Sequence, residues 1–198
     1  LSLVVSSLCA NILISSTAFE SEYKPNIIYI LADDLGYGDV NCLNPESKIP
    51  TPNLDKLAKQ GITFTDAHSG SAVCSPTRYG ILTGRYAWRS KLQAGVLWTW
   101  DKPLIEENRL TVPAYLKERG YHTACIGKWH LGINWRDKKG DILKDTGAEK
   151  GWNIDFSQPL ENGPTTRGFD YFFGMDAPNY PPYCYIENNQ TIGIPTKD

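Results

Sequence analysis

The sequence lacks any excess of positive charge, because 20 lysines and arginines stand against 22 aspartates and glutamates in 198 residues. A nucleic-acid-binding domain usually carries a clear basic excess, and a polybasic membrane patch needs clustered lysines and arginines. Histidine is scarce, with three residues in the chain, so a histidine-rich metal site is not expected. The remaining composition, 41% hydrophobic and 21% charged, is typical of one globular domain.

Signals for cysteine pairing are missing as well. The five cysteines are scattered and form neither a C-x-x-C pair nor a zinc-type spacing. Such an odd, dispersed set does not indicate a disulfide framework. A disulfide between Cys42 and Cys184 could form in an oxidising compartment, and the spacing of the cysteines does not decide whether it does.

Residues 1–18 are apolar and small and carry no charge. This composition is typical of the hydrophobic region and cleavage site of a secretory signal peptide that lacks its positively charged N-terminal region. We therefore expect residues 1–18 to be the remnant of a signal peptide, and the protein to be secreted, periplasmic or lysosomal. The mature chain is expected to have no membrane span. The alternative is an N-terminal helix of the core.

The rest of the chain alternates between strand and helix signals. Runs of apolar and β-branched residues predict strands at 26–32, 62–65 and 121–126. Threonines at cap positions, followed by apolar stripes and glycine stops, predict helices after Thr51 and Thr111. This alternation predicts an α/β fold with a largely parallel sheet flanked by helices. Residues 135–168 are polar and glycine-rich and are expected to form a long loop region.

Two adjacent carboxylates, Asp33 and Asp34, follow the first predicted strand. Ligands bind beyond the carboxyl ends of strands in open α/β sheets. Neighbouring carboxylates at such a place repel each other unless a cation lies between them. Oxygen ligands favour Ca²⁺ or Mg²⁺. The pair therefore indicates a metal site, and a solvated turn is the alternative.

A second cluster is the run Cys74-Ser75-Pro76-Thr77-Arg78. Proline suits the first turn of a helix, so Cys74 is expected at a helix N-terminus, where free N–H groups and the helix dipole favour an anion. Arg78 follows one turn later on the same face and can hold an oxyanion or the group that attacks it. Three residues separate Cys74 and Arg78, whereas the tyrosine-phosphatase loop has five. The alternative is a buried structural cysteine with a surface arginine.

The third cluster is Lys128-Trp129-His130, flanked by glycines directly after the predicted strand 121–126. In an extended segment, side chains alternate, so Lys128 and His130 are expected on one side and Trp129 on the other. Lysine can neutralise an oxyanion, and histidine can hold or protonate a leaving group. Both on one side favour a functional site, and two residues without a shared function are the alternative.

Together these motifs resemble the formylglycine-dependent sulfatase family, in its arylsulfatase A-like branch of the alkaline-phosphatase superfamily. Cys74-x-Pro76-x-Arg78 matches the maturation signature of that family, and residues 120–132 and 168–174 are similar to further family motifs. The run 26–36 resembles its first strand and metal pair. The resemblance implies an alkaline-phosphatase-like fold, with residues 19–198 as the N-terminal portion of a sulfatase catalytic domain whose C-terminal half lies outside this chain.

The resemblance also implies hydrolysis of sulfate esters by covalent catalysis. A maturation enzyme would oxidise Cys74 to formylglycine, whose hydrated form attacks the sulfur and later expels sulfate. Arg78 would stabilise this nucleophile, and Lys128 would bind a sulfate oxygen. His130 would orient the attacking hydroxyl or help its deprotonation.

Asp33, Asp34 and the modified Cys74 would hold Ca²⁺, with Mg²⁺ as the second choice. The other metal ligands of the family, and its second histidine and lysine, have no counterpart after His130, so the chain alone is expected to be inactive. Two alternatives stay open: a phosphonate monoester or phosphodiester hydrolase of the same superfamily, and a non-catalytic truncated relative. The sulfate ester is not identified. Tryptophans are candidates for stacking on its ring, with core packing expected for at least two of Trp98, Trp100, Trp135 and Trp152.

Overall fold

The computed structural model describes residues 24–143 and 153–193. The chain divides into two units, residues 1–32 and 33–198. The predicted signal-peptide remnant at 1–18 lies outside the described residues. Residues 26–32 form no strand, and the side chains of Ile28 and Ile30 are more than four-fifths exposed. The prediction of a buried strand there is wrong, because a strand of this kind needs neighbours on both edges and cover on both faces.

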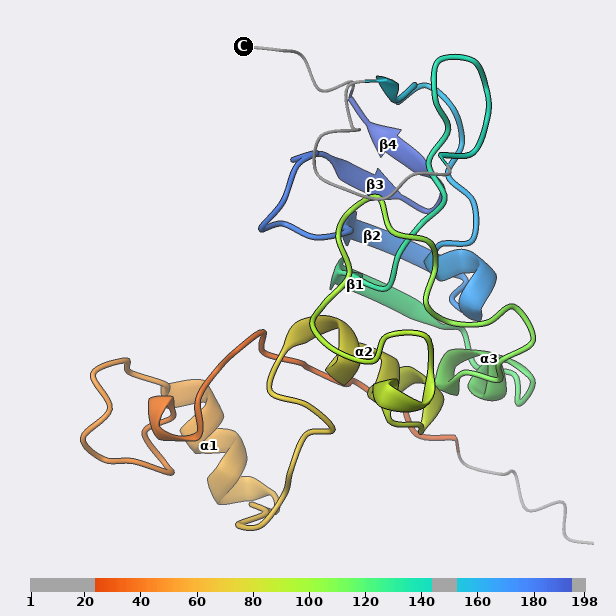
Figure 1. Cartoon of the computed structure of the whole chain (residues 1–198). Helices are drawn as coiled ribbons and strands as arrows, with labels where there is room; N and C mark the ends of the chain where they lie inside the picture. Colours follow the sequence, from red (N-terminus) through yellow and green to blue (C-terminus); the bar gives the residue numbers. More distant parts are fainter. Residues whose placement is uncertain (1–23, 144–152, 194–198) are drawn as a thin grey trace, which may run out of the picture. The chain divides into compact units, whose positions relative to one another are not determined.

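A four-stranded sheet forms the centre of the second unit (Figure 1). Its order is β1 (Ala124–Lys128), β2 (Tyr171–Met175), β3 (Tyr185–Glu187) and β4 (Gln190–Ile192). β1 and β2 are parallel, whereas β2–β3 and β3–β4 are antiparallel. The sheet is therefore mixed, and the prediction of a largely parallel sheet is wrong. A two-residue turn joins β3 to β4, and so short a connection permits only antiparallel pairing.

The helices agree better with the sequence. They are α1 (Pro52–Gln60), α2 (Cys74–Thr83) and α3 (Val112–Lys117), with short 3₁₀ turns at Tyr37–Asp39, Ala87–Arg89 and Pro164–Arg167. Thr111 caps α3 by accepting a hydrogen bond from the Ala114 N–H. Thr51 occupies the cap position of α1, but its hydroxyl donates to Asp55 Oδ1 instead of capping a backbone amide. Both predicted helices are confirmed.

The predicted strand at 62–65 is absent. Ile62 and Phe64 are 82% and 74% exposed, and α1 before them buries none of its residues. The apolar character of this stretch is real, but no described strand lies beside it to accept its backbone hydrogen bonds. The third predicted strand, 121–126, is present with shifted bounds as β1.

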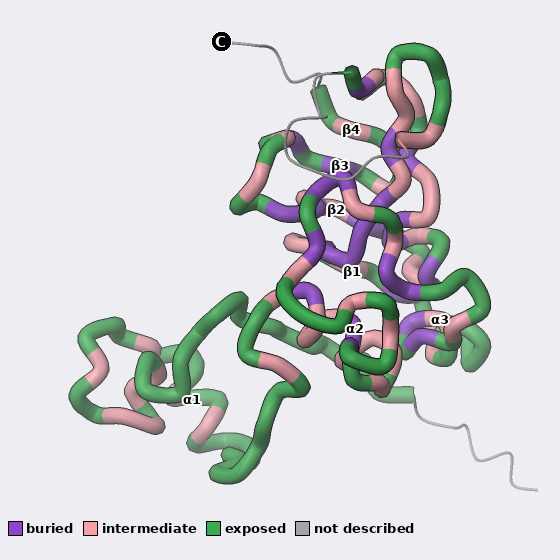
Figure 2. Tube along the Cα trace, in the orientation of Figure 1, coloured by how far each residue is buried: buried purple, intermediate pink, exposed green. Residues whose placement is uncertain are grey.

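The core lies against β1, β2 and β3, as the concentration of buried positions in Figure 2 shows. Trp100 and Trp135 meet edge to face there, with ring centroids 5.3 Å apart, and both are at most 5% exposed. The expectation that at least two of the candidate tryptophans are core residues is confirmed. Trp152 lies outside the described residues.

The described parts of the polar stretch 135–168 contain isolated bridges and one 3₁₀ turn, as a long loop region would. All four described cysteines are free, so no bond joins Cys42 and Cys184. Within residues 24–143 and 153–193, no helix has the length and apolarity needed to cross a membrane.

Candidate functional site

The N-terminus of α2 carries the predicted nucleophile. Cys74 is the first residue of this helix, after the extended Val73, and its free thiol is half-buried. Pro76 stands in the first turn, as predicted. The next residue after Cys74, Ser75, is fully buried, and its hydroxyl accepts a hydrogen bond from the Leu97 N–H at 3.1 Å. This contact ties the start of α2 to the segment that precedes Trp98.

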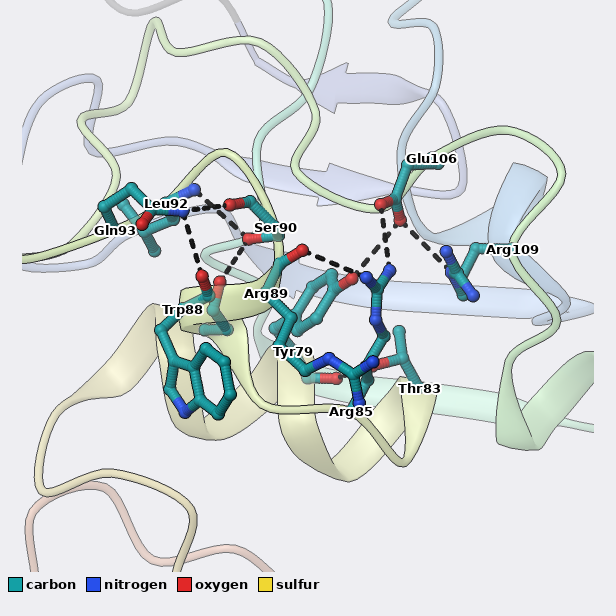
Figure 3. A network of polar contacts seen from close by, with 11 residues as sticks. Tyr79, Thr83, Arg85, Trp88, Arg89, Ser90, Leu92, Gln93, Glu106 and Arg109 are labelled. Atoms are coloured by element: carbon teal, nitrogen blue, oxygen red, sulfur yellow. Dashed lines mark hydrogen bonds and ion pairs between the residues drawn. The ribbon is translucent and has the colours of Figure 1, made fainter.

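The C-terminal half of α2 is held by a second set of contacts, drawn in Figure 3. Glu106 accepts a hydrogen bond from the hydroxyl of Tyr79 at 3.3 Å and pairs with Arg85 and Arg109 at 3.5 and 3.3 Å. Tyr79 is fully buried and directly follows Arg78 in the helix. The orientation of Arg78 is therefore fixed from both ends of α2.

Arg78 and Lys128 converge on one carboxylate. The Arg78 Nη2 lies 3.1 Å from Asp33 Oδ1, and the Lys128 Nζ lies 2.8 Å from Asp33 Oδ2. Arg78 also donates to the backbone carbonyl of Lys128. Partial burial acts to raise the pKa of Asp33, but the hydrogen bonds and charges of Lys128 and Arg78 outweigh it and hold that pKa below its usual range. The three clusters predicted from sequence thus meet in one place.

His130 also belongs to this place, but for a different reason from the predicted one. Its φ is +53°, so the segment is not extended there and simple alternation does not apply. The β1–β2 ladder continues beyond β1, because the His130 N–H donates to the Asp176 carbonyl at 2.8 Å. The next bend needs Gly132, since a Cβ there would lie 2.7 Å from the Lys102 carbonyl oxygen.

The ring of His130 is almost completely buried. Its Nε2 lies 2.7 Å from the Leu97 carbonyl oxygen. A carbonyl only accepts hydrogen bonds, so Nε2 carries the proton and Nδ1 has the free lone pair. Nδ1 has no partner among the described residues. Burial lowers the pKa of His130, and the charges of Lys128 and Arg78 act in the same direction, so the ring is neutral near pH 7.

The predicted metal ligands lie at the exposed edge of this cluster. Asp34 adopts a left-handed backbone conformation, with φ +58°, and is exposed. Both carboxylates offer the hard oxygen donors that Ca²⁺ takes. Within the described part of the chain, however, no group of three or more His, Cys, Asp or Glu side chains is placed to hold a metal ion. Asp33 and Asp34 therefore fit a cation by donor type and fall short by donor number.

Sequence reasoning missed Asp176. It directly follows β2, and its side chain is 4% exposed with neither oxygen hydrogen-bonded among the described residues. Burial raises its pKa to about 7, against the opposing effects of the His130 N–H and the Lys128 charge. The signal was available, because Asp176 follows an apolar strand in the same way as Asp33 follows the run 26–32.

Comparison with known proteins finds one family over most of the chain. The sequence model named Sulfatase matches residues 25–192. An N-acetylgalactosamine-6-O-sulfatase of Bacteroides thetaiotaomicron is 37% identical over 90% of this chain and 32% of its own length. Human steryl-sulfatase is 37% identical over 79% of this chain and 24% of its own length. The chain thus spans about a third or less of these relatives.

Two solved structures share the fold. One, from work on the metabolism of multiple glycosaminoglycans by Bacteroides thetaiotaomicron, superposes with a TM-score of 0.72 at 37% identity over 87% of this chain and 32% of its own. The other, Ps i-CgsB in complex with k-i-k-neocarrahexaose, gives a TM-score of 0.60 at 28% identity over 86% of this chain and 37% of its own.

Proposed function

Because the chain belongs to the sulfatase family, we propose that the full-length protein hydrolyses sulfate esters. One observation carries this proposal: Lys128 and Arg78, which follows Cys74 by one turn of α2, converge on Asp33. Asp33 balances the charge of one of these two cations, so its ion pairs leave one positive charge uncompensated. The free N–H groups at the start of α2 add to it. Such a place suits the sulfate group of an ester.

Lys128 and Arg78 are proposed to bind the sulfate oxygens. Their side chains are only 7% and 12% exposed, so water screens their charges poorly and their attraction for an anion is stronger than at an open surface. The Arg78 Nε is buried without a partner among the described residues, and an unpaired buried donor is stabilised by an incoming acceptor. Charge that grows on these oxygens during the reaction is stabilised by the same two groups.

We infer that a maturation enzyme converts Cys74 to formylglycine. The hydrated aldehyde supplies an oxygen nucleophile at the start of α2. His130 accepts a proton through Nδ1, because Nε2 is engaged by the Leu97 carbonyl. Nδ1 has no partner among the described residues, and the charge of Lys128 acts on the ring, so Nδ1 has a free lone pair for a substrate hydroxyl that enters beside it. Its neutral state at pH 7 is the state that a base requires.

Asp33 and Asp34 are proposed as two ligands of a divalent cation, with Ca²⁺ favoured over Mg²⁺. When bound, this ion would add positive charge opposite the sulfate oxygens. Ca²⁺ takes about six to eight oxygens, and the two carboxylates supply few of them. We therefore expect residues 1–198 alone to bind Ca²⁺ weakly and to show no turnover.

For the substrate class, two of the similar proteins favour sulfated sugars, whereas human steryl-sulfatase is named for a sterol. One relative is named an N-acetylgalactosamine-6-O-sulfatase, and one structural relative was solved with a neocarrahexaose. We propose a sulfate ester of a sugar for this protein too.

The test uses full-length protein from a host that has a formylglycine-generating enzyme. We expect release of sulfate from N-acetylgalactosamine 6-sulfate or 4-nitrophenyl sulfate. Mass spectrometry of the peptide that contains residue 74 is expected to show an aldehyde in place of the thiol. Cys74→Ala should abolish turnover, whereas Cys42→Ala, at an exposed free cysteine, should retain it. Fully active protein with an unmodified Cys74 thiol would refute the mechanism.

A further inference from the structure

Trp98 differs from the tryptophans of the core. Its side chain is 48% exposed, whereas Trp100 and Trp135 are 5% and 2% exposed. An indole with so much free surface loses part of the hydrophobic stabilisation that a buried one gains. Among the described residues, packing therefore covers only about half of this indole.

The backbone places Trp98 beside the catalytic cluster. The preceding residue, Leu97, donates its N–H to Ser75 in α2 and accepts a hydrogen bond from His130 through its carbonyl. Trp98 therefore directly follows a residue that contacts both α2 and His130. Its own N–H donates to Asp101 Oδ2 at 2.7 Å, which fixes the turn that presents the indole.

A second aromatic ring completes the surface. Tyr180, from the β2–β3 connection, has its ring centroid 4.9 Å from that of Trp98, with the two planes tilted by 53°. The same ring lies 6.1 Å from the imidazole of His130. Tyr180 therefore bridges the exposed indole and the proposed base.

We propose that Trp98 and Tyr180 form a platform that binds the pyranose ring of a sulfated sugar while its sulfate reaches Lys128 and Arg78. This inference rests on the proposed function and adds the residues that recognise the sugar. Ligand sites combine aromatic walls with a few placed polar groups, and the apolar C–H face of a pyranose ring packs on a flat aromatic face.

A polar group at the platform favours a sugar over an aryl group. Asp101 lies at the turn, is partly buried, and accepts the Trp98 N–H through Oδ2. Its carboxylate has further capacity to accept hydrogen bonds. Sugar hydroxyls donate them, and the ring of an aryl sulfate has no such donor.

The chain offers a matched control in Trp88. Its indole is also exposed, at 61%, and lies against a tyrosine, Tyr86, with ring centroids 5.9 Å apart. Its backbone carbonyl accepts a hydrogen bond from the Gln93 side chain, which a side-chain substitution leaves in place. Trp88→Ala therefore removes an exposed indole whose ring partner is not part of the catalytic cluster.

The experiment compares wild type, Trp98→Ala, Trp98→Phe and Trp88→Ala in full-length protein. KM and kcat are measured with N-acetylgalactosamine 6-sulfate and with 4-nitrophenyl sulfate. We expect Trp98→Ala to raise KM for the sugar sulfate about tenfold, equivalent to about 1.4 kcal/mol, with kcat changed less than about twofold. Trp98→Phe should recover part of the loss, and Trp88→Ala should match wild type. Thermal unfolding of each variant checks that the fold is intact.

The outcomes separate this inference from the proposed function. Unchanged KM for the sugar sulfate in folded Trp98→Ala overturns the platform while leaving sulfatase activity in place. An equal rise in KM for both substrates overturns the assignment to sugars. If wild type hydrolyses neither ester, the proposed function fails. Calorimetric binding of N-acetylgalactosamine 6-sulfate then tests the platform alone, with about tenfold weaker binding expected for Trp98→Ala and equal binding contradicting it.

Discussion

At the scale of single residues, the site is organised by charge around Asp33. Each of its carboxylate oxygens contacts a different cation, Lys128 or Arg78. This arrangement keeps Asp33 ionised and holds both cations in place before any ligand arrives. Preorganised charge of this kind stabilises a reaction because the groups need not reorient as charge develops.

Lys128→Ala tests the role of this charge. We expect kcat for a sulfate ester to fall by about 10²–10³, the usual loss when one preorganised group is removed from a transition state. Arg78 still pairs with Asp33 in this variant, so the fold should persist. Lys138→Ala, at an exposed lysine, is the control and should retain the wild-type rate. Steady-state kinetics decide, and wild-type kcat/KM in Lys128→Ala would contradict the assignment.

His130 gives a pH-dependence with a definite sign. Burial, Lys128 and Arg78 lower its pKa below 6.5, although Asp33 and the Leu97 carbonyl act in the opposite direction. A base must be unprotonated, so activity should rise as pH increases through this lowered pKa and level off before neutrality. Asp176, whose carboxyl is buried, lies next to His130 in the β1–β2 ladder, and burial raises the pKa of that carboxyl to about 7. Its effect on the pH profile must therefore be distinguished from that of His130.

The measurement is the pH profile of kcat/KM for wild type, His130→Asn and Asp176→Asn. We expect the acid limb of wild type to have its midpoint below pH 6.5, to persist in Asp176→Asn and to vanish from the low residual rate of His130→Asn. A limb with a midpoint at or above 6.5, or one that survives in His130→Asn, would show that another group is the base.

The places of these residues could be predicted from sequence because each stands at the end of an element. Cys74 begins α2 with Arg78 one turn later, and Lys128 is the last residue of β1. Long-range pairing could not be predicted in the same way. The ion pairs of Asp33 join residues 45 and 95 positions apart, and the left-handed φ of His130 follows from the ladder to Asp176 rather than from its neighbours.

At the scale of elements, the sequence predicted helices correctly from local signals, whereas two of the three predicted strands are absent from the described residues. α1 and α3 begin after the predicted threonines, and α2 begins at Cys74 as Pro76 predicts, because a helix satisfies its hydrogen bonds within one segment. Strands depend on partners that the local sequence does not specify. The runs 26–32 and 62–65 have suitable composition, yet neither forms a strand, whereas β1 does because β2 lies beside it.

Thr111 is the clearest test at this scale. Its buried hydroxyl donates to the Arg167 carbonyl at 2.7 Å and accepts from the Ala114 N–H at 3.3 Å. Thr111→Val keeps the shape and leaves both backbone groups without this partner. We expect the free energy of unfolding to fall by about 1–3 kcal/mol. Thr63→Val, at an exposed position, should change it by less than about 0.5 kcal/mol. Denaturant titration measures both, and equal stability of the two variants would contradict the cap.

At the scale of the whole molecule, the sheet places the site at one of its edges. β1 is one of the two outer strands of the described sheet, and it ends at Lys128. Ile126 within it is 68% exposed, so the described residues cover this strand poorly. The core instead gathers between β2, β3 and the segments around Trp100 and Trp135.

Hydrogen exchange of the 198-residue chain tests this distribution. Amides in β2 are paired on both sides, to β1 and to β3, and β2 carries the fully buried Phe172. They should exchange slowest, because their exposure requires the largest opening. Amides at 26–32 belong to no strand and should exchange at nearly the rate of an unstructured peptide. Mass-spectrometric exchange resolves both segments. Protection at 26–32 comparable to that of β2 would show that this apolar run pairs as a strand in solution, and the sequence-based prediction would then be restored.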